Sequence, residues 1–306
     1  MSKVLVLMST YNGERFLKEQ IESVMKQTGV EVTLLIRDDG SHDNTVNLIK
    51  DFQKTYCNIV FLKGENCGSA LSFLKLLNEA TANYADYDFF AFCDQDDVWK
   101  DDKLISAVMV LENQSKATPC LYLGAYQMVD VNLNNIVTPK RIAQLNLPSA
   151  IASNIATGCT MVFNYCLAKL ISTNCYPKNI IMHDYWIYLV CLAVGGYIYY
   201  DKIPHILYRQ HNNNVIGGLK DSFLKKWFTR ISKFFKPGDC FKSKLAGSLL
   251  TCYGDEINNE NRKFLYYVST SNKWNSKYHL LRNRNFRGDS LDTNLQIFGL
   301  IITGKF

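Results

Sequence analysis

The sequence lacks the features that mark exported, zinc-binding or membrane-spanning proteins. Its ten cysteines occur singly, with no C-x-x-C pair and no His/Cys cluster at zinc spacing. That pattern favours a reducing compartment in which cysteines are small, buried hydrophobic residues. The apolar run at residues 4–8 is too short for a signal-peptide core, and the uncharged stretch at residues 185–200 contains two glycines. We therefore expect a cytoplasmic protein without a transmembrane helix.

Acidic residues are scarce in the last third of the chain. Residues 1–201 carry 16 Lys/Arg against 21 Asp/Glu, whereas residues 202–306 carry 18 against 7. Residues 222–236 interleave aromatic residues with lysines, a pattern that predicts an amphipathic basic helix. Its apolar side either lies on an anionic membrane surface or packs on protein. No recognised nucleic-acid-binding motif accompanies the charge, so we do not expect a nucleic-acid partner.

The first 130 residues alternate strand and helix signals, with no internal repeat. With 47% apolar and 20% charged residues, the chain has an ordinary globular composition. Short apolar runs followed by amphipathic segments predict an α/β fold with a parallel, doubly wound sheet. The expected strands are residues 4–8, 32–36, 59–62 and 89–93, and the expected helices begin near residues 14, 43, 69 and 101.

Polar clusters follow three of these strands. They occupy residues 9–12, 38–41 and 94–97. In open α/β sheets, ligands bind beyond the carboxyl ends of the strands, so these clusters should lie together at one edge. The third cluster contains Asp94, Asp96 and Asp97, whose carboxylates would repel one another unless a cation lay between them. A Mg²⁺ or Mn²⁺ ion shared with a diphosphate would do so; the alternative is a solvated turn that caps the next helix.

Three segments together resemble the start of family 2 glycosyltransferases, which have the GT-A fold. They are VLVLMSTYNGERFLKEQIESVMKQT, LLIRDDGSHDNT and FFAFCDQDDVWKDDKL. The resemblance is in order through about residue 110 and continues more weakly to about residue 215. It implies a GT-A-type doubly wound, mostly parallel sheet with helices on both faces. We expect a catalytic domain at residues 1–215, with a donor-binding half at 1–110 and an acceptor-binding half at 111–215, and a basic helical extension at 216–306.

The resemblance also implies roles for residues of the donor-binding half. Thr10 and Tyr11 would line the pocket for the nucleotide base, and Asp39 would accept a hydrogen bond from the pyrimidine N3–H. An ionised carboxylate suits this imide N–H because it can accept hydrogen bonds but cannot donate them. Asp94 and Asp96 would form the D-x-D site for metal and diphosphate, with Asp96 as the more direct ligand.

Further candidates lie in other loops. Asn66 either contacts the donor, as an Asn-x-Gly does in many relatives, or forms a plain turn. Gly158 lies in a segment that resembles the acceptor site, where it either admits the substrate to the backbone or forms a bulge. Asp184 precedes an apolar helix and matches the carboxylate that removes the acceptor proton; it could also cap that helix. We expect Trp186, beside it, to contact the acceptor.

The segment YRQHNNNV, residues 208–215, resembles bacterial rhamnosyltransferase-like members of the family. Arg209 would then neutralise the departing diphosphate and His211 would complete the metal shell, unless the segment is an exposed loop. The Q-x-x-R-W motif of processive polymerases is missing. A nucleotidyltransferase would need a glycine-rich basic loop after its first strand, and residues 9–13 provide none.

The predicted function is an inverting, metal-dependent transfer of a sugar from a nucleotide-diphosphate donor to a hydroxyl of a saccharide. The preferred donor is dTDP-rhamnose, with a UDP-hexose as the alternative, in bacterial cell-surface polysaccharide synthesis. The acceptor would be a saccharide or a lipid-linked saccharide, which would place the enzyme on the inner face of the plasma membrane as a peripheral protein. A homo-oligomer and a non-catalytic sugar-nucleotide-binding protein remain open.

Overall fold

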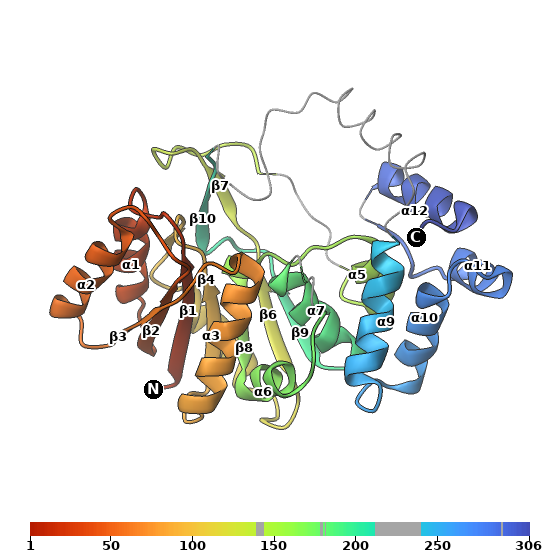
Figure 1. Cartoon of the computed structure of the whole chain (residues 1–306), viewed down its shortest axis with the longest axis horizontal. Helices are drawn as coiled ribbons and strands as arrows, with labels where there is room; N and C mark the ends of the chain where they lie inside the picture. The colour runs from red at the N-terminus through yellow and green to blue at the C-terminus, as the bar shows by residue number, and fades with distance from the viewer. Residues whose placement is uncertain (139–143, 178–179, 181, 212–239, 289) are drawn as a thin grey trace.

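A computed structural model describes residues 1–138, 144–177, 180, 182–211, 240–288 and 290–306 (Figure 1). Its centre is a seven-stranded sheet with the strand order β3-β2-β1-β4-β8-β6-β9. The first four of these are parallel, whereas β8 runs antiparallel to both of its neighbours. The strands are β1 (Lys3–Thr10), β2 (Glu31–Asp38), β3 (Ile59–Lys63), β4 (Phe89–Cys93), β6 (Cys120–Gly124), β8 (Val162–Asn164) and β9 (Tyr197–Asp201). The predicted mostly parallel α/β sheet is confirmed.

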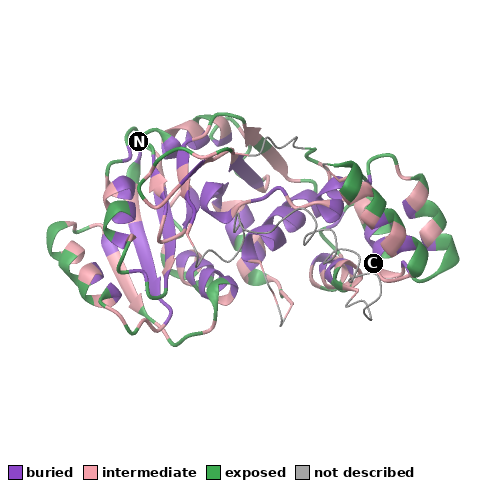
Figure 2. Ribbon diagram, turned by 90° about the horizontal axis from the view of Figure 1, so that it is seen from above, coloured by how far each residue is buried: buried purple, intermediate pink, exposed green. Residues whose placement is uncertain are grey.

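Helices cover both faces of this sheet because the inner strands are apolar on both sides. Along β1, Leu5 and Leu7 join one core cluster, whereas Val4, Val6 and Met8 join the other. The first cluster includes side chains of α3 (Ser69–Asn83), α6 (Tyr165–Thr173) and α7 (His183–Ala193). The second includes side chains of α1 (Leu17–Met25), α2 (Thr45–Thr55) and α4 (Lys103–Leu111). Figure 2 shows both buried layers.

A second, three-stranded sheet adjoins the acidic loop. Its order is β5-β10-β7, from β5 (Val98–Trp99), β10 (Ile206–Arg209) and β7 (Gln127–Val129). Strand β5 directly follows residues 94–97, and β10 pairs with it. This pairing brings Arg209, which is far away in the sequence, to the acidic loop.

Four helices are described in the C-terminal region: α9 (Phe241–Tyr253), α10 (Asn259–Ser269), α11 (Trp274–Arg282) and α12 (Leu291–Thr303). Their buried side chains belong to the same core cluster as α5 (Leu147–Ala152) and α7. The described part of this region therefore packs on the sheet domain through a continuous apolar core. The domain boundary at residue 215 stays a prediction, and the amphipathic segment 222–236 lies outside the described residues.

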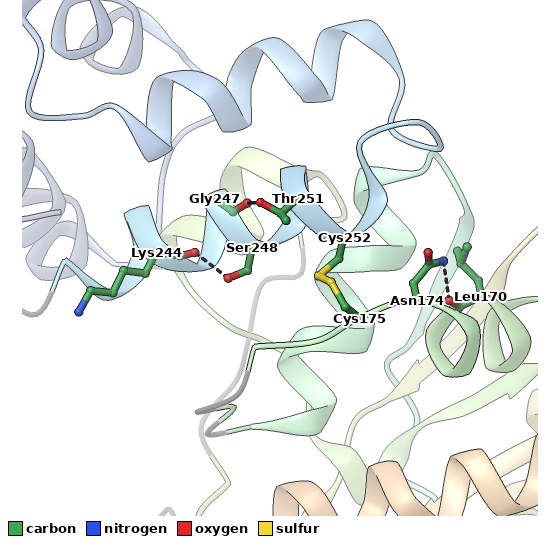
Figure 3. Close-up of a disulfide and its surroundings, with 8 residues drawn as sticks. All are labelled: Leu170, Asn174, Cys175, Lys244, Gly247, Ser248, Thr251 and Cys252. Carbon is green, nitrogen blue, oxygen red and sulfur yellow. Dashed lines mark hydrogen bonds between the residues drawn. A yellow bond between two sulfur atoms is a disulfide. The ribbon is translucent and has the colours of Figure 1, made fainter.

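The expectation that all ten cysteines are unpaired packing residues is wrong. Cys175, which follows α6, forms a disulfide with Cys252 of α9 across a sequence separation of 77 (Figure 3). The remaining eight cysteines are free. Sequence spacing did not reveal the pair because the two half-cystines meet only after α9 packs beside α7. None of the helices in the described ranges combines the length and the hydrophobicity that a membrane span needs.

Candidate active site

The three polar clusters meet at the carboxyl edge of the sheet, as predicted. Thr10 at the end of β1 is paired in register with Asp38 at the end of β2, and Met8 is paired with Cys93 at the end of β4. The Thr10 hydroxyl donates a hydrogen bond to Asp38 across 3.2 Å. Because β1 is parallel to both β2 and β4, the loops that follow these three strands lie at one edge of the sheet. Ligands bind at this edge in such sheets.

The first and third clusters are joined through Gln95. Its side-chain oxygen accepts the Tyr11 N–H at 2.9 Å, and its side-chain nitrogen donates to the Tyr11 carbonyl at 3.0 Å. The Tyr11 side chain remains 44% exposed. The backbone of Tyr11 is therefore fixed while its ring is accessible to a nucleotide base.

Both aspartates of the second cluster have structural partners. Asp38 accepts the N–H groups of Gly40 and Ser41, which closes the turn. Asp39 accepts from the Arg37 guanidinium at 2.5 Å and from the N–H groups of Cys67 and Gly68. Although burial opposes it, hydrogen bonding by Arg37 and Cys67 holds the pKa of Asp39 below its usual value.

Asp39 therefore has a structural role in this loop, whether or not it also contacts a ligand. Asp39 anchors the loop that precedes α3, and its contact with the base stays a prediction. In that loop, Asn66 is exposed, and its backbone nitrogen lies 3.2 Å from the position of a Cβ on Gly40. Gly40 has a φ of +84°, so the turn and the loop of Asn66 come together only because residue 40 is glycine.

Asp94 faces other carboxylates. Burial, followed by the nearby charges of Asp96 and Asp184, raises its pKa to about 7. The start of α7 lies close to the acidic loop, although the two are 90 residues apart in sequence. The Gly158 N–H donates to Asp184 at 3.0 Å, and the Sγ of the next residue, Cys159, lies within 4.8 Å of ligand atoms of Asp94 and Asp97. A divalent cation would relieve this repulsion, so Asp94 and Asp96 fit the predicted metal site.

Asp97 lies behind this site and is fully buried. One of its oxygens accepts the Arg209 N–H at 3.0 Å, and the other has no hydrogen-bond partner among the described residues. Ligand atoms of Asp97, Asp94 and Cys159 lie within 4.8 Å of one another. A hard cation prefers accessible carboxylates to a buried thiol, and Asp97 is fully buried, so we assign Asp97 a supporting position.

The buried Lys103 ammonium shares this region. It lies 3.5 Å from the centre of the Trp99 ring and has no hydrogen-bond partner in the described part of the chain. Burial lowers its pKa to about 8, against the opposing influence of Cys93, Cys159 and Asp97. A cation under the acidic loop offsets part of the negative charge that the loop concentrates there.

Arg209 does not lie where a donor-binding residue should. It is 1% exposed, and its guanidinium donates to the Asp96 carbonyl, the Val131 carbonyl and the Glu19 carboxylate. The prediction of direct donor contact does not fit this placement, because the guanidinium is buried and donates to three protein groups. Arg209 instead fixes the backbone of the acidic loop, and the alternative of a solvated surface arginine is also wrong.

His211 contacts the acidic loop as expected. Its Nε2 lies 2.8 Å from an Asp96 oxygen, and its ring stacks on Phe16 at 5.2 Å between centroids. These contacts place an imidazole and a carboxylate together at the entrance of the site. Imidazole nitrogen and carboxylate oxygen are both suitable ligands, so His211 and Asp96 would be available to hold a divalent cation.

Asp184 is held by the backbone. It lies in the first turn of α7, which begins at His183, so it is not the cap of that helix. Its carboxylate accepts the Gly158 N–H at 3.0 Å and the Tyr185 N–H at 2.7 Å. Burial raises its pKa to about 6. The neighbouring His183 stacks on Phe73, and burial lowers its pKa to about 3, which fits the absence of a catalytic assignment.

Two acceptor predictions do not fit the structure. A Cβ on Gly158 would lie 3.1 Å from His183 Nε2 and 3.4 Å from Asp184 Cβ, so the close approach at Gly158 is made by protein side chains. Trp186 is 1% exposed and its ring is 6.0 Å from that of Tyr253 in α9. It belongs to the core between α7 and the C-terminal region, away from an acceptor.

Sequence reasoning missed four residues of the site. Gln95 is the variable position of the D-x-D motif, and Lys103 is the first residue of α4. Phe16 and Glu19 lie at the start of α1, where they contact His211 and Arg209 respectively. The D-x-D spacing could have drawn attention to Gln95, but no local signal marks the other three.

A mostly parallel sheet with helices on both faces, an acidic loop at its carboxyl edge and a buried carboxylate across from that loop define an enzyme of the GT-A type. Residues 5–166 match the Glycosyl transferase family 2. The chain belongs to this family and is a glycosyltransferase.

Two similar proteins have described activities. The dTDP-rhamnosyl transferase RfbG of Shigella flexneri is 30% identical over 219 residues, which cover 69% of this chain and 73% of the relative. The UDP-Glc:alpha-D-GlcNAc-diphosphoundecaprenol beta-1,3-glucosyltransferase WfgD of Escherichia coli is 30% identical over 193 residues, which cover 62% and 69%.

Solved structures share the fold at low identity. TarS of S. aureus in complex with UDP-GlcNAc has a TM-score of 0.57 at 14% identity, over 99% of this chain and 93% of that one. The mannosyltransferase PcManGT of Pyrobaculum calidifontis, in complex with GDP-Man and Mn²⁺, has a TM-score of 0.52 at 16% identity, over 99% and 86%.

Proposed function

We propose that this glycosyltransferase moves L-rhamnose from dTDP-rhamnose to a saccharide hydroxyl, with inversion, in the synthesis of a bacterial cell-surface polysaccharide. The observation that supports the transfer reaction is the short link from Asp184 to the acidic loop through Gly158 and Cys159, since the base and the leaving-group site must face one sugar. The similarity to a dTDP-rhamnosyl transferase supports the choice of sugar.

Asp184 is the general base in this proposal. Its pKa of about 6 leaves it ionised near neutral pH yet close enough to that pH to take a proton efficiently. The N–H groups of Gly158 and Tyr185 hold its carboxylate in place. The acceptor oxygen loses its proton to Asp184 while it attacks the anomeric carbon, and the bond to the nucleoside diphosphate breaks on the opposite side.

Asp94, Asp96 and His211 would hold a divalent cation. Such a cation, when bound, stabilises the charge that develops on the departing diphosphate. A structural neighbour was solved with GDP-Man and Mn²⁺, and Mg²⁺ would suit the same oxygen ligands. On the donor side, the exposed Tyr11 and Asn66 would border the space for the nucleotide. Thr10 and Asp39 are 0% and 2% exposed, so they would reach the base only if the neighbouring loops moved.

A second candidate is transfer of a hexose from a UDP donor. It is favoured by the similarity to a UDP-Glc-dependent glucosyltransferase and by the fold shared with a protein bound to UDP-GlcNAc. Both candidates use a pyrimidine base that carries an N3–H, so Asp39 would not distinguish them. The glucosyltransferase acts on a diphosphoundecaprenol-linked sugar, which makes a lipid-linked saccharide a reasonable acceptor here too.

Donor profiling tests the proposal. Purified protein is incubated with Mn²⁺ and with dTDP-rhamnose, UDP-glucose, UDP-GlcNAc or GDP-mannose, and release of the nucleoside diphosphate is measured. We expect the fastest release from dTDP-rhamnose, and its loss in Asp96→Asn but not in the surface variant Asp51→Asn. Preference for a UDP-hexose would select the second candidate, and no binding or hydrolysis of any donor would refute both.

A further inference from the structure

Helix α12 is apolar on two sides. Ile297 and Ile301 point into the core, where they are 5% and 2% exposed. A second set of apolar side chains faces solvent: Leu291 is 75% exposed, Leu295 61%, Phe298 52% and Ile302 50%. Their spacing of four, three and four residues puts them in one row along the helix. The solvent side of a surface helix is ordinarily polar, so this row requires an explanation.

Helix α11, which contacts the end of α12, carries exposed aromatic residues. Trp274 is 86% exposed, and Tyr278, one turn later on the same side of the helix, is 52% exposed. The Lys277 ammonium donates to the Ile302 carbonyl at 2.8 Å and lies 5.4 Å from the centre of the Trp274 ring. This contact ties α11 to the end of α12. We define the C-terminal patch as Trp274, Tyr278, Leu291, Leu295, Phe298 and Ile302.

Basic side chains contact the aromatic residues of the patch: Lys277 lies over the Trp274 ring and Arg282 over the Tyr278 ring, 5.4 Å and 5.2 Å from the ring centres. Residues 270–306 contain six Lys/Arg against two Asp/Glu, a balance of +4. Lys273, Arg282, Arg284 and Arg287 are exposed. A contact between two copies through this patch would be self-complementary and would bring these like charges together. A negatively charged partner with an apolar interior suits both the aliphatic row and its basic margin.

We propose that the C-terminal patch binds the surface of an anionic lipid bilayer. The row on α12 enters the boundary between headgroups and acyl chains, and the aromatic rings of α11 lie at headgroup level. The surrounding Lys and Arg side chains remain in water near the lipid phosphates. This binding requires neither donor nor acceptor, and it involves residues other than the segment 222–236.

The position of the patch suits an enzyme that works on a membrane-anchored substrate. In Figure 1, β1 runs upward from the N-terminus, and α12 lies at the height of β7 and β10, near the carboxyl edge of the sheet. Helix α12 therefore lies toward the same end of the molecule as the loops that follow the parallel strands.

Vesicle sedimentation tests the proposal. The full chain is mixed with vesicles of phosphatidylcholine alone, or of phosphatidylcholine and phosphatidylglycerol in equal parts, and the bound fraction is measured. We expect binding to the anionic vesicles that weakens as salt is raised. The double variant Leu295→Ser, Phe298→Ser should bind at least about tenfold more weakly, since two half-exposed apolar side chains no longer enter the lipid.

The control is Met109→Ser, which removes an apolar side chain that is 60% exposed on α4. It should bind like the unchanged protein. Thermal unfolding and donor hydrolysis should be unchanged in the double variant, so a loss of vesicle binding is separable from misfolding and from failure of the transfer proposal. Equal binding by the double variant would overturn the proposal, as would light scattering that shows a dimer which the double substitution converts to monomer.

Discussion

In the proposed reaction, some side chains of the site take part in the transfer, whereas others keep the site in its folded arrangement. Asp184 is held by two backbone N–H groups and faces Asp94, whereas Arg209 is buried against backbone carbonyls and Glu19. The two groups differ in what their loss should change. Removing a reacting group lowers the rate and spares the fold, while removing a buried holding group lowers stability first.

Asp184→Asn should lower kcat by about 10²- to 10⁴-fold, because the amide cannot accept the acceptor proton. Donor affinity, measured by calorimetry, should be preserved. In the unchanged enzyme, kcat/KM should fall as the pH drops below about 6, since the protonated form of a carboxyl with a pKa raised to about 6 is inactive. The exposed Asp51→Asn is the control; near-normal transfer by Asp184→Asn would exclude the base role.

Arg209→Met should destabilise the protein by about 2 kcal/mol or more, because the carbonyls of Asp96 and Val131 lose a charged donor in a buried place. The measurement is urea unfolding, with the exposed Arg284→Met as control. If Arg209 instead bound the donor directly, KM would rise while the unfolding midpoint stayed constant. That outcome would restore the role expected from the sequence.

At the scale of elements, the start of α7 and the end of α6 determine where Asp184 lies. The segment between them begins at the disulfide of Cys175 with Cys252 (Figure 3). The disulfide therefore attaches the chain leading to α7 to the C-terminal helix α9. The C-terminal helices are therefore joined to the chain that leads to Asp184 by this covalent link and by the shared core.

Cys252→Ser should lower the free energy of unfolding by about 2–4 kcal/mol under oxidising conditions, because it frees a loop in the unfolded chain. The exposed, free Cys57→Ser should have no such effect. Both are compared by urea unfolding, with and without reductant. Titration of all ten thiols in the denatured, unreduced protein would show that the bond does not form.

Elements also explain what sequence could and could not predict. Strand ends are local features, so the meeting of Thr10, Asp38 and Asp94 at one edge followed from the order of strands and helices. All eleven residues of α7 are buried, which leaves no polar side from which to infer the direction of Trp186. Arg209 and Glu19 are 190 residues apart, and no periodicity connects them.

At the scale of the whole molecule, binding of a divalent cation should raise the free energy of unfolding. Mn²⁺ should raise the unfolding temperature, with a gain of about 2.7 kcal/mol at a hundredfold excess over Kd. The gain should be larger at about pH 8 than at about pH 5, because a cation must displace the proton of a carboxyl whose pKa is raised to about 7. Asp96→Asn should abolish the shift and Asp51→Asn should keep it; an equal shift in both would place the ion elsewhere.

The two hydrogen bonds between Gln95 and the Tyr11 backbone have a thermodynamic consequence. Gln95 lies between the two aspartates of the D-x-D motif, so ordering that loop around a cation also orders the peptide beside the nucleotide base. The cation and the nucleotide then share the entropic cost of ordering this loop. Each therefore raises the affinity of the protein for the other by the same factor. Nucleotide should bind more weakly without metal even at its base, and Gln95→Glu, which cannot donate to the Tyr11 carbonyl, should reduce this cooperativity.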